Sequence, residues 1–427
     1  MSGVDQARWF MPGRIEVLGK HTDYGGGRVL VCAVDRGVTV TAQALPDAVA
    51  GPARAGVVEA STEAFDGTVR LEVGTDPGLP SGHWARYVQT VMERLTSNFG
   101  ELRPARISMT STLPPASGMS SSSAVICAVA LALADLSGLP QSDLWRAELP
   151  DRLALAGYAA SIENGKTFGN LPGRPGVGTS GGSLDHTGML TSEEGMVSYA
   201  QFDPMQIIDR VALPPELCFV VGVSGVLAEK TGAAQEAYNR GPALLQAVLD
   251  RWNTQTGRSD ATVQAAVRSL LVADREDLTR PVDPADERLE LLRRAASGAA
   301  EARRLEQFLQ ESCLLVPSAR EALGRGDLDA FAQLVERSQA LAATHLENQV
   351  PETVGLVDMA RDLGAVSSSS FGAGWGGSVW ALVQADGADD FAAAWEQRYR
   401  SAFPDAVGAS MIRTRPGTPG HRLDSDA

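Results

Sequence analysis

Three short segments of the chain combine residue types that could act on hydroxyl and phosphate groups. The first, residues 12–27 (PGRIEVLGKHTDYGGG), passes from a strand-like stretch into a cluster of hydrogen-bonding side chains and then three glycines. The glycines predict a tight turn, in which His21 and Asp23 lie two residues apart. Those two side chains could hold adjacent hydroxyl groups, although a plain polar hairpin turn also fits this segment by itself.

The second segment is a serine-rich loop, residues 113–124 (LPPASGMSSSSA), which leads directly into the apolar run 124–134. That run predicts a buried helix over 124–136. Free backbone N–H groups and the dipole at the start of this helix favour phosphate binding, and a serine hydroxyl there can ligate Mg²⁺. An ordinary serine cap or a linker is the alternative, but a linker would not lead straight into a buried helix.

The third segment, residues 367–383 (SSSSFGAGWGGSVWALV), is rich in glycine, which lets a backbone approach a ligand or another strand closely. A glycine-rich hairpin is the alternative. The GxGxxG patterns at 372–377 and 176–181 do not predict a dinucleotide site, because neither follows a strand and opens a helix. GTSGG at 178–182 lacks the flanking strand and helix of a nucleophilic serine.

Composition narrows the class of protein. The 427 residues carry a net charge of −15, the opposite of what nucleic-acid binding favours. Four scattered cysteines without a CxxC pair exclude a disulfide scaffold and a cysteine zinc site. The N-terminus lacks a signal-peptide pattern, and the longest apolar run is far shorter than the roughly 18 residues of a membrane span. We therefore expect a cytoplasmic monomer with neither a nucleic-acid nor a membrane partner.

Short strands interspersed with helices predict an α+β fold rather than a regular βα alternation. Residues 164–184 contain a long Gly/Pro/Ser-rich loop, of the kind that is often functional in compact domains. The expected strands are 28–44, 67–73, 104–112, 217–227 and 407–412, and the expected helices are 83–95, 124–136, several within 229–363, and 388–401.

The three segments, in this order, resemble the GHMP small-molecule kinases and, among them, the galactokinases. Residues 12–30 resemble the galactokinase signature, 114–124 the phosphate loop and 371–383 the third motif; HWARYVQTVM (83–92) is also similar to a galactokinase stretch. The resemblance implies a two-domain GHMP kinase fold, with a ribosomal-S5-like N-terminal domain and a ferredoxin-like C-terminal domain. We expect the domains at 1–208 and 209–413, followed by a mobile tail at 414–427.

The resemblance also implies a reaction and its residues. ATP would phosphorylate the anomeric hydroxyl of galactose or a galactose-like sugar, with Asp185 as the base and Arg14 beside it. Glu163 and Ser122 would hold Mg²⁺, and His21, Asp23 and Tyr238 would contact the sugar. The nucleotide would be bound by Trp84, Pro115, Ala116, Ser117, Gly118, Met119, Ser120, Ser121, Ser122 and Ser123.

Two departures from the family pattern affect these expectations. Lys20 stands where galactokinases have a glutamate that faces the sugar's C6 hydroxyl. We expect Lys20 either to pair with a C6 carboxylate, as in galacturonate, or to leave room for a pentose such as L-arabinose. Gly241-Pro242 is expected to interrupt a helix after Tyr238. The sugar-contacting role that the family resemblance gives to Tyr238 is therefore less well supported.

Two other functions stay open at this stage. Some galactokinase relatives bind ATP and sugar as sensors without turnover, but the intact serines of residues 120–124 favour an enzyme. A GHMP kinase that acts on a non-sugar alcohol is the second alternative. The polar HTDY turn argues against it, because an apolar substrate would require an apolar pocket.

Overall fold

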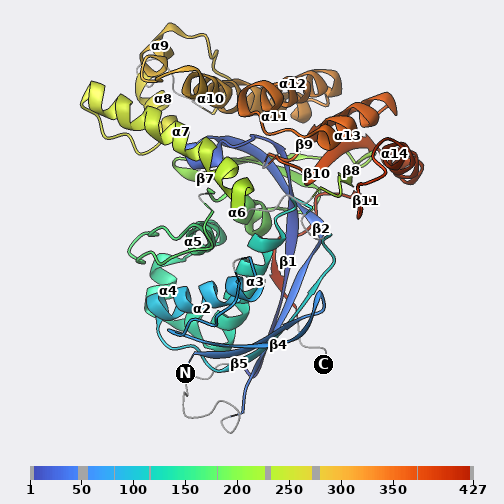
Figure 1. The fold of residues 1–427 in the computed structure, drawn as a ribbon. Coiled ribbons are helices and arrows are strands. Elements are labelled where there is room, and N and C mark those ends of the chain that lie inside the picture. The colour runs from blue at the N-terminus through green and yellow to red at the C-terminus, as the bar shows by residue number, and fades with distance from the viewer. Residues whose placement is uncertain are drawn as a thin grey trace.

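The computed structural model describes residues 4–46, 56–80, 82–114, 117–179, 181–226, 232–271, 279–372 and 374–423. The N-terminal half of the chain forms one body and the C-terminal half packs above it (Figure 1). The predicted α+β class is confirmed, since each body combines a sheet with helices. Among the described residues, no helix combines the length and the apolar character needed to cross a bilayer.

The N-terminal body is built on a sheet with the strand order β12-β1-β2-β5-β3-β4, to which β6 and β7 are added through β2. The long strand β2 makes this possible, because its first residues pair with β6 and its last residues pair with β5. The strands are β1 (Gln6–Leu18), β2 (Arg28–Ala44), β3 (Val57–Thr62), β4 (Phe65–Glu72), β5 (Ala105–Ser111), β6 (Met196–Phe202), β7 (Met205–Ala212) and β12 (His421–Arg422).

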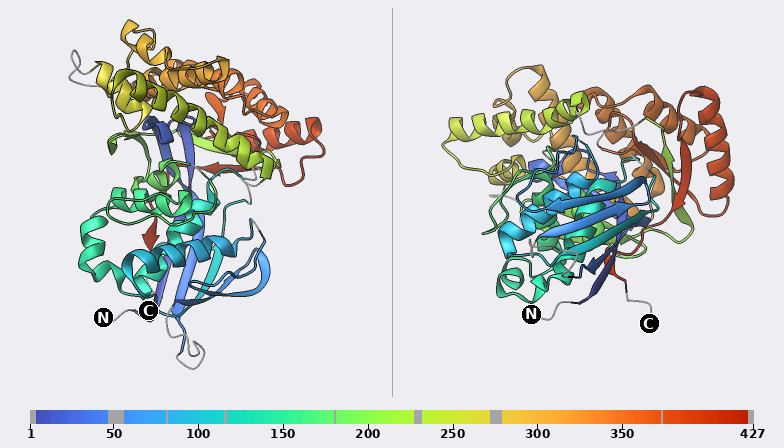
Figure 2. Two further views of the ribbon diagram at one scale, coloured as in Figure 1. Left: turned by 60° about the vertical axis from the view of Figure 1, so that its left-hand side comes forward. Right: turned by 60° about the horizontal axis from the view of Figure 1, so that its bottom comes forward.

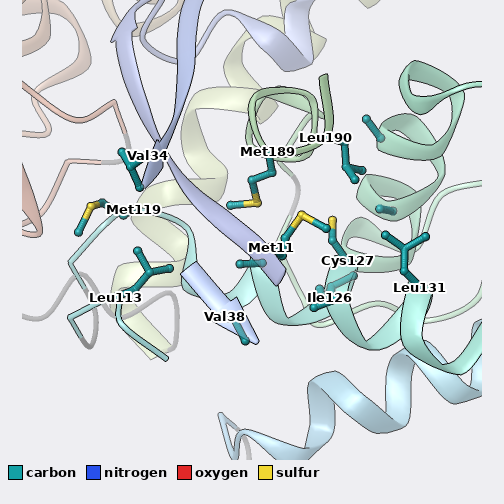
Figure 3. Packing of buried hydrophobic residues seen from close by; sticks show 14 of the residues in the cluster. Met11, Val34, Val38, Leu113, Met119, Ile126, Cys127, Leu131, Met189 and Leu190 are labelled. Carbon is teal, nitrogen blue, oxygen red and sulfur yellow. The ribbon is translucent and has the colours of Figure 1, made fainter. Parts of the chain in front are cut away.

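Helix α3 (Ser121–Leu136) is the apolar helix predicted from the sequence, and most of its side chains are buried. Figure 3 shows Ile126 and Cys127 of this helix among apolar side chains of the sheet and of α6. The packing fixes the start of α3, and with it the serine-rich loop, against β1. The other helices of this body are α2 (Ala85–Phe99), α4 (Asp143–Glu148), α5 (Arg152–Asn164) and α6 (Leu184–Thr191).

The C-terminal body has an antiparallel sheet in the order β11-β8-β10-β9, formed by β8 (Leu217–Val223), β9 (Ser367–Ser370), β10 (Ser378–Gln384) and β11 (Ser410–Thr414). Helices α13 (Pro351–Asp362) and α14 (Ala388–Ala402) pack against this sheet (Figure 2). Their apolar side chains are buried together with those of the strands. The remaining helices are α7 (Gly232–Thr256), α8 (Val263–Leu271), α9 (Glu290–Arg293), α10 (Ala299–Leu309), α11 (Val316–Gly324) and α12 (Leu328–Leu341). A π-helical turn, η5 (Gln310–Leu315), joins α10 to α11.

Three expectations about chain organisation are corrected. Strand β7 continues to Ala212 and pairs with β6, so the first sheet extends beyond residue 208. Helix α7 runs without interruption through Pro242. The segment 414–423 is not a mobile tail: β12 pairs with β1, and the N–H of Gly417 donates to the carbonyl of Ala33 at 2.9 Å. The C-terminal segment therefore completes the N-terminal sheet.

We expect Gly417→Ala to lower the free energy of unfolding by about 1–3 kcal/mol. A Cβ atom at this position would lie 2.6 Å from the carbonyl oxygen of Val34, and that backbone is fixed in β2. Chemical denaturation measures the change. Gly324→Ala is the matched control, because its Cβ would meet only Val211, at 3.9 Å. Equal stability of the two variants would contradict the packing described for the C-terminal segment.

Candidate active site

A small cavity of about 40 Å³ lies where the two bodies meet. It receives side chains from β1, α5, α6 and α7, together with Gly372 of the third motif. Lys20, Trp84 and the described residues of the serine-rich loop do not line it. The predicted site residues that line it are Arg14, His21, Asp23, Glu163, Asp185 and Tyr238.

Asp185 and Arg14 form the central ion pair of this cavity. Asp185 is the second residue of α6, where the helix dipole favours a negative charge. Both Nε and one terminal nitrogen of Arg14 lie 2.7 Å from Oδ1 of Asp185. The other terminal nitrogen donates to the carbonyl of Gly118 at 2.6 Å. The guanidinium group therefore connects the carboxylate to the serine-rich loop.

The serine-rich loop also contacts Asp185 directly. The hydroxyl of Ser120 donates to Oδ2 of Asp185 at 2.5 Å. Ser120 has φ 59°, a left-handed conformation that is uncommon outside glycine and is found at functional sites. Each oxygen of the Asp185 carboxylate thus has a separate donor, one from β1 and one from the loop.

Other members of the predicted nucleotide site lie at the start of α3 or immediately before α2. Ser121, Ser122 and Ser123 form the first turn of α3. Trp84 is half-buried immediately before α2, with its ring centroid 5.5 Å from that of His83. Pro115 and Ala116 lie outside the described residues.

Glu163 lies near the end of α5 in a buried polar cluster. The hydroxyl of Ser123 donates to its Oε2 at 2.7 Å, and Nε2 of His186 is 3.2 Å from the same oxygen. In this structure Ser123 donates to Glu163, and the expected role of Ser122 as a Mg²⁺ ligand stays a prediction. Successive residues of a helix differ in direction by about 100°, so adjacent serines at the start of α3 face different neighbours.

The donors around Glu163 fit Mg²⁺. Mg²⁺ is typically held by one or two carboxylates together with substrate phosphates, and hydroxyl oxygen is a suitable further ligand. The described residues contain no group of three His, Cys, Asp or Glu side chains placed to hold a metal ion. A magnesium ion at Glu163 would thus depend on a bound nucleotide for most of its ligands.

The turn at residues 19–24 carries the predicted sugar-contacting side chains. His21 has φ 56°, its Nδ1 is 3.0 Å from the hydroxyl of Tyr24, and its ring centroid is 5.5 Å from that of Tyr238. Asp23 accepts a hydrogen bond from the N–H of Leu184 at 3.3 Å. Burial and the nearby Asp185 raise the pKa of Asp23. The turn is therefore tied to the start of α6, which carries Asp185.

Lys20 points away from the cavity. It is 1% exposed, and its Nζ donates to Oε1 of Gln339 at 2.7 Å and to the hydroxyl of Ser369 at 2.6 Å. Burial lowers its pKa to about 8, against the opposite effect of Glu311 and Glu16. The expected contact between Lys20 and the C6 end of a sugar is thus not supported by its position.

Glu16, which the sequence analysis did not select, lines the cavity on the same face of β1 as Arg14. It is 5% exposed, and no described residue hydrogen-bonds to its Oε1. Burial raises its pKa to about 7, although Arg14 and Lys20 act in the opposite direction. A Cβ atom at Gly372 would lie 2.2 Å from Oε1, so the third motif needs glycine there to accommodate Glu16.

Comparison with known proteins identifies the family. The model of the GHMP kinases N-terminal domain matches residues 86–173, that of the GHMP kinases C-terminal domain matches 319–401, and the galactokinase galactose-binding signature matches 2–44. This chain belongs to the GHMP kinases. As a member of that family, it is a phosphotransferase with an alcohol group as acceptor.

The similar proteins align with almost the whole length of this chain. The galactokinase of Mycobacterium tuberculosis is 27% identical over 407 residues, covering 95% of this chain and 97% of its own length. That of Thermococcus kodakarensis is 26% identical over 411 residues, covering 96% and 99%. Lactococcus lactis galactokinase complexed with galactose superimposes with a TM-score of 0.77 at 21% identity, covering 98% and 95%. L. major mevalonate kinase in complex with R-mevalonate superimposes with a TM-score of 0.55 at 16% identity, covering 97% of this chain and 99% of its own length. The two structures show the fold.

Several residues of this kinase's site were missed from the sequence. His186 directly follows Asp185, and this neighbourhood is the only feature of the sequence that could have indicated a place for His186 in the site. Glu16 is separated from Arg14 by one residue in a strand-like stretch, so strand periodicity could have placed both on one face. No local pattern indicates that Ser120 contacts Asp185, because the two residues are 65 positions apart.

We expect Glu16→Gln to gain stability relative to the native chain as pH rises. Because the pKa of Glu16 is raised to about 7 in the folded protein, its contribution to stability is complete below its ordinary pKa of 4.5. That contribution is lost as pH rises through about 7, whereas glutamine does not ionise. Chemical denaturation at pH 5 and pH 8 measures the difference, with the exposed Glu194→Gln as control. A difference that is the same at both pH values would contradict the raised pKa.

We expect Lys20→Met to destabilise the protein by roughly 3–5 kcal/mol, because it removes a positive charge that favours the ionised form of the fully buried Glu311. Chemical denaturation measures this loss. Adding Glu311→Gln to Lys20→Met should recover part of it, which is the signature of an interacting pair in a double-mutant cycle. Additive effects of the two substitutions would show that the charges do not interact.

Proposed function

We propose that this GHMP kinase transfers the γ-phosphoryl group of ATP to the anomeric hydroxyl of galactose or a galactose-like sugar. The observation that carries the proposal is the position of Asp185. Its carboxylate bonds to Arg14 and to Ser120 of the serine-rich loop, and it lines the same cavity as His21 and Asp23. One carboxylate therefore lies between the predicted phosphate site and the predicted sugar site.

In the proposed mechanism, Asp185 accepts the proton of the acceptor hydroxyl as its oxygen forms a bond to the γ-phosphorus. The bond from that phosphorus to the β–γ bridging oxygen breaks, and ADP leaves with the electron pair. Arg14 keeps Asp185 ionised through two short contacts and offsets negative charge on the phosphoryl group. The dipole of α6 also favours the ionised form of Asp185.

One carboxylate of this chain, that of Glu163, is placed to hold a metal ion on the nucleotide. Glu163, with a hydroxyl from the start of α3, would hold Mg²⁺ on the nucleotide, where it supplies charge neutralisation at the phosphates. Ser123 keeps the Glu163 carboxylate in place, and His186 contacts the same oxygen.

The composition of the cavity supports a polyhydroxy acceptor. Asp23, His21 and the hydroxyls of Tyr24 and Tyr238 supply hydrogen-bonding groups in a small space, whereas an apolar acceptor would require apolar walls. The similar galactokinases, one of them complexed with galactose, support the same acceptor class. A pentose acceptor, expected on the basis of Lys20, has no support from the position of that side chain.

We expect Asp185→Asn to lower kcat for D-galactose by about 100- to 10,000-fold, because the amide cannot accept the hydroxyl proton. The KM for ATP should change far less. A coupled assay of ADP release, run over a panel of neutral monosaccharides, measures both parameters.

Asp151→Asn is the matched control for this experiment. Asp151 caps α5 from the surface, and asparagine is an equally good cap, so this variant also loses one carboxylate outside the cavity. Full turnover by Asp185→Asn would show that Asp185 is not the base. Absence of turnover by the native chain with every sugar of the panel would contradict the proposed function.

A further inference from the structure

A second cavity, of about 140 Å³, adjoins the first on the far side of His21 and Tyr238, whose side chains line both. We call it the arginine hollow. Its other walls come from α7, α10, the segment 345–348 and Trp375. A molecule with its reacting hydroxyl at Asp185 would have its opposite end near these two rings.

Positive charge predominates in the arginine hollow. Arg240, Arg303 and Arg304 line it together with one carboxylate, that of Glu347, which pairs with Arg303 at 3.4 Å. The whole chain carries a net charge of −15, so this local excess of guanidinium groups runs against the overall charge. Such a cluster favours an anionic ligand.

Two of these guanidinium groups retain hydrogen-bonding capacity. Arg304 is 2% exposed and donates to the carbonyl of His21 and to the hydroxyl of Tyr24, but no described residue accepts from its Nε. The Nε of Arg303 is likewise buried without a described acceptor. A buried donor without a partner costs free energy, which a bound acceptor atom would recover.

Helix α7 is unusual where it passes the arginine hollow. Gly241 lies inside the helix, where glycine costs about 1 kcal/mol relative to alanine. A Cβ atom there would lie 2.8 Å from the hydroxyl of Tyr24 and 3.8 Å from Nε of Arg304. The absence of a side chain therefore keeps the space beside these groups open.

Trp375 of the third motif also lines the arginine hollow. It has φ 57°, a strained conformation for a bulky residue, and its N–H donates to the carbonyl of Asn348 at 2.7 Å. Its side chain is 37% exposed, which is high for a tryptophan. Its exposed ring gives the arginine hollow an apolar face against which a carbon skeleton can pack.

We propose that the arginine hollow binds an anionic group carried by the acceptor at the end opposite its reacting hydroxyl. The acceptor class would be a galactose-like sugar with a carboxylate or phosphate at C6. This inference rests on the proposed function and specifies its acceptor. The charge is recognised by Arg240 and Arg303, not by Lys20, which is bonded to Gln339 and Ser369.

The test compares kcat/KM for D-galacturonate and D-galactose 6-phosphate with kcat/KM for D-galactose. The native chain should prefer at least one of the charged acceptors. Arg240→Ala combined with Arg303→Ala should lower the ratio of charged to neutral kcat/KM at least tenfold. Both side chains are partly exposed, so the variant should still fold. Arg294→Ala, which removes an exposed arginine 71% accessible to solvent, is the matched control and should leave the ratio unchanged.

The outcomes separate the two proposals. The anion site in the arginine hollow would be contradicted if D-galactose is turned over without preference for a charged acceptor. It would also be contradicted if the double substitution leaves the ratio of charged to neutral kcat/KM unchanged. The proposed function would stand in both cases. If no sugar is turned over, the proposed function fails. Calorimetric titration with D-galacturonate then tests whether the arginine hollow binds an anionic group. Binding that is at least tenfold weaker in the double variant would support the anion site, and equal binding or none would overturn it.

Discussion

The Asp185 carboxylate and its two donors are the interaction on which the site depends. Arg14 comes from β1, Ser120 from the loop before α3, and Asp185 from the start of α6. These elements are held together by one continuous apolar core, in which α3 packs between the sheet and its neighbouring helices. A shift of α3 relative to β1 would therefore separate the Asp185 carboxylate from its donors.

The turn at residues 19–24 is supported by the C-terminal body as well as by its own strand. Glu311, in the π-helical turn η5, accepts from the N–H groups of Gly19 and Lys20 at 3.0 and 3.3 Å. Gln307 donates to the carbonyl of Lys20 at 2.9 Å. A π-helical turn changes the direction of side chains within a helix, and such turns are frequent at functional sites. The two bodies thus share the construction of the site.

Lys20 and Glu16 illustrate how charge is distributed around this turn. Both side chains are buried, and each favours the charged form of the other. Glu16, on β1, faces the cavity, whereas Lys20, in the 19–24 turn, faces the C-terminal body. Lys20, where the chain departs from the galactokinase pattern, lies outside the cavity and bonds to Gln339 and Ser369.

The sequence by itself determined the family, the α+β class and six of the residues that line the cavity, because these depend on motifs whose residues are close together and on the periodicity of apolar residues. Tertiary structure alone decided the direction of Lys20, the pairing of Ser123 with Glu163 and the return of residues 414–423 to the first sheet. The hydroxyl of Ser369 that receives Lys20 is 349 positions away in the chain. Contacts of this kind follow from how the two bodies pack, which no local pattern of residues specifies.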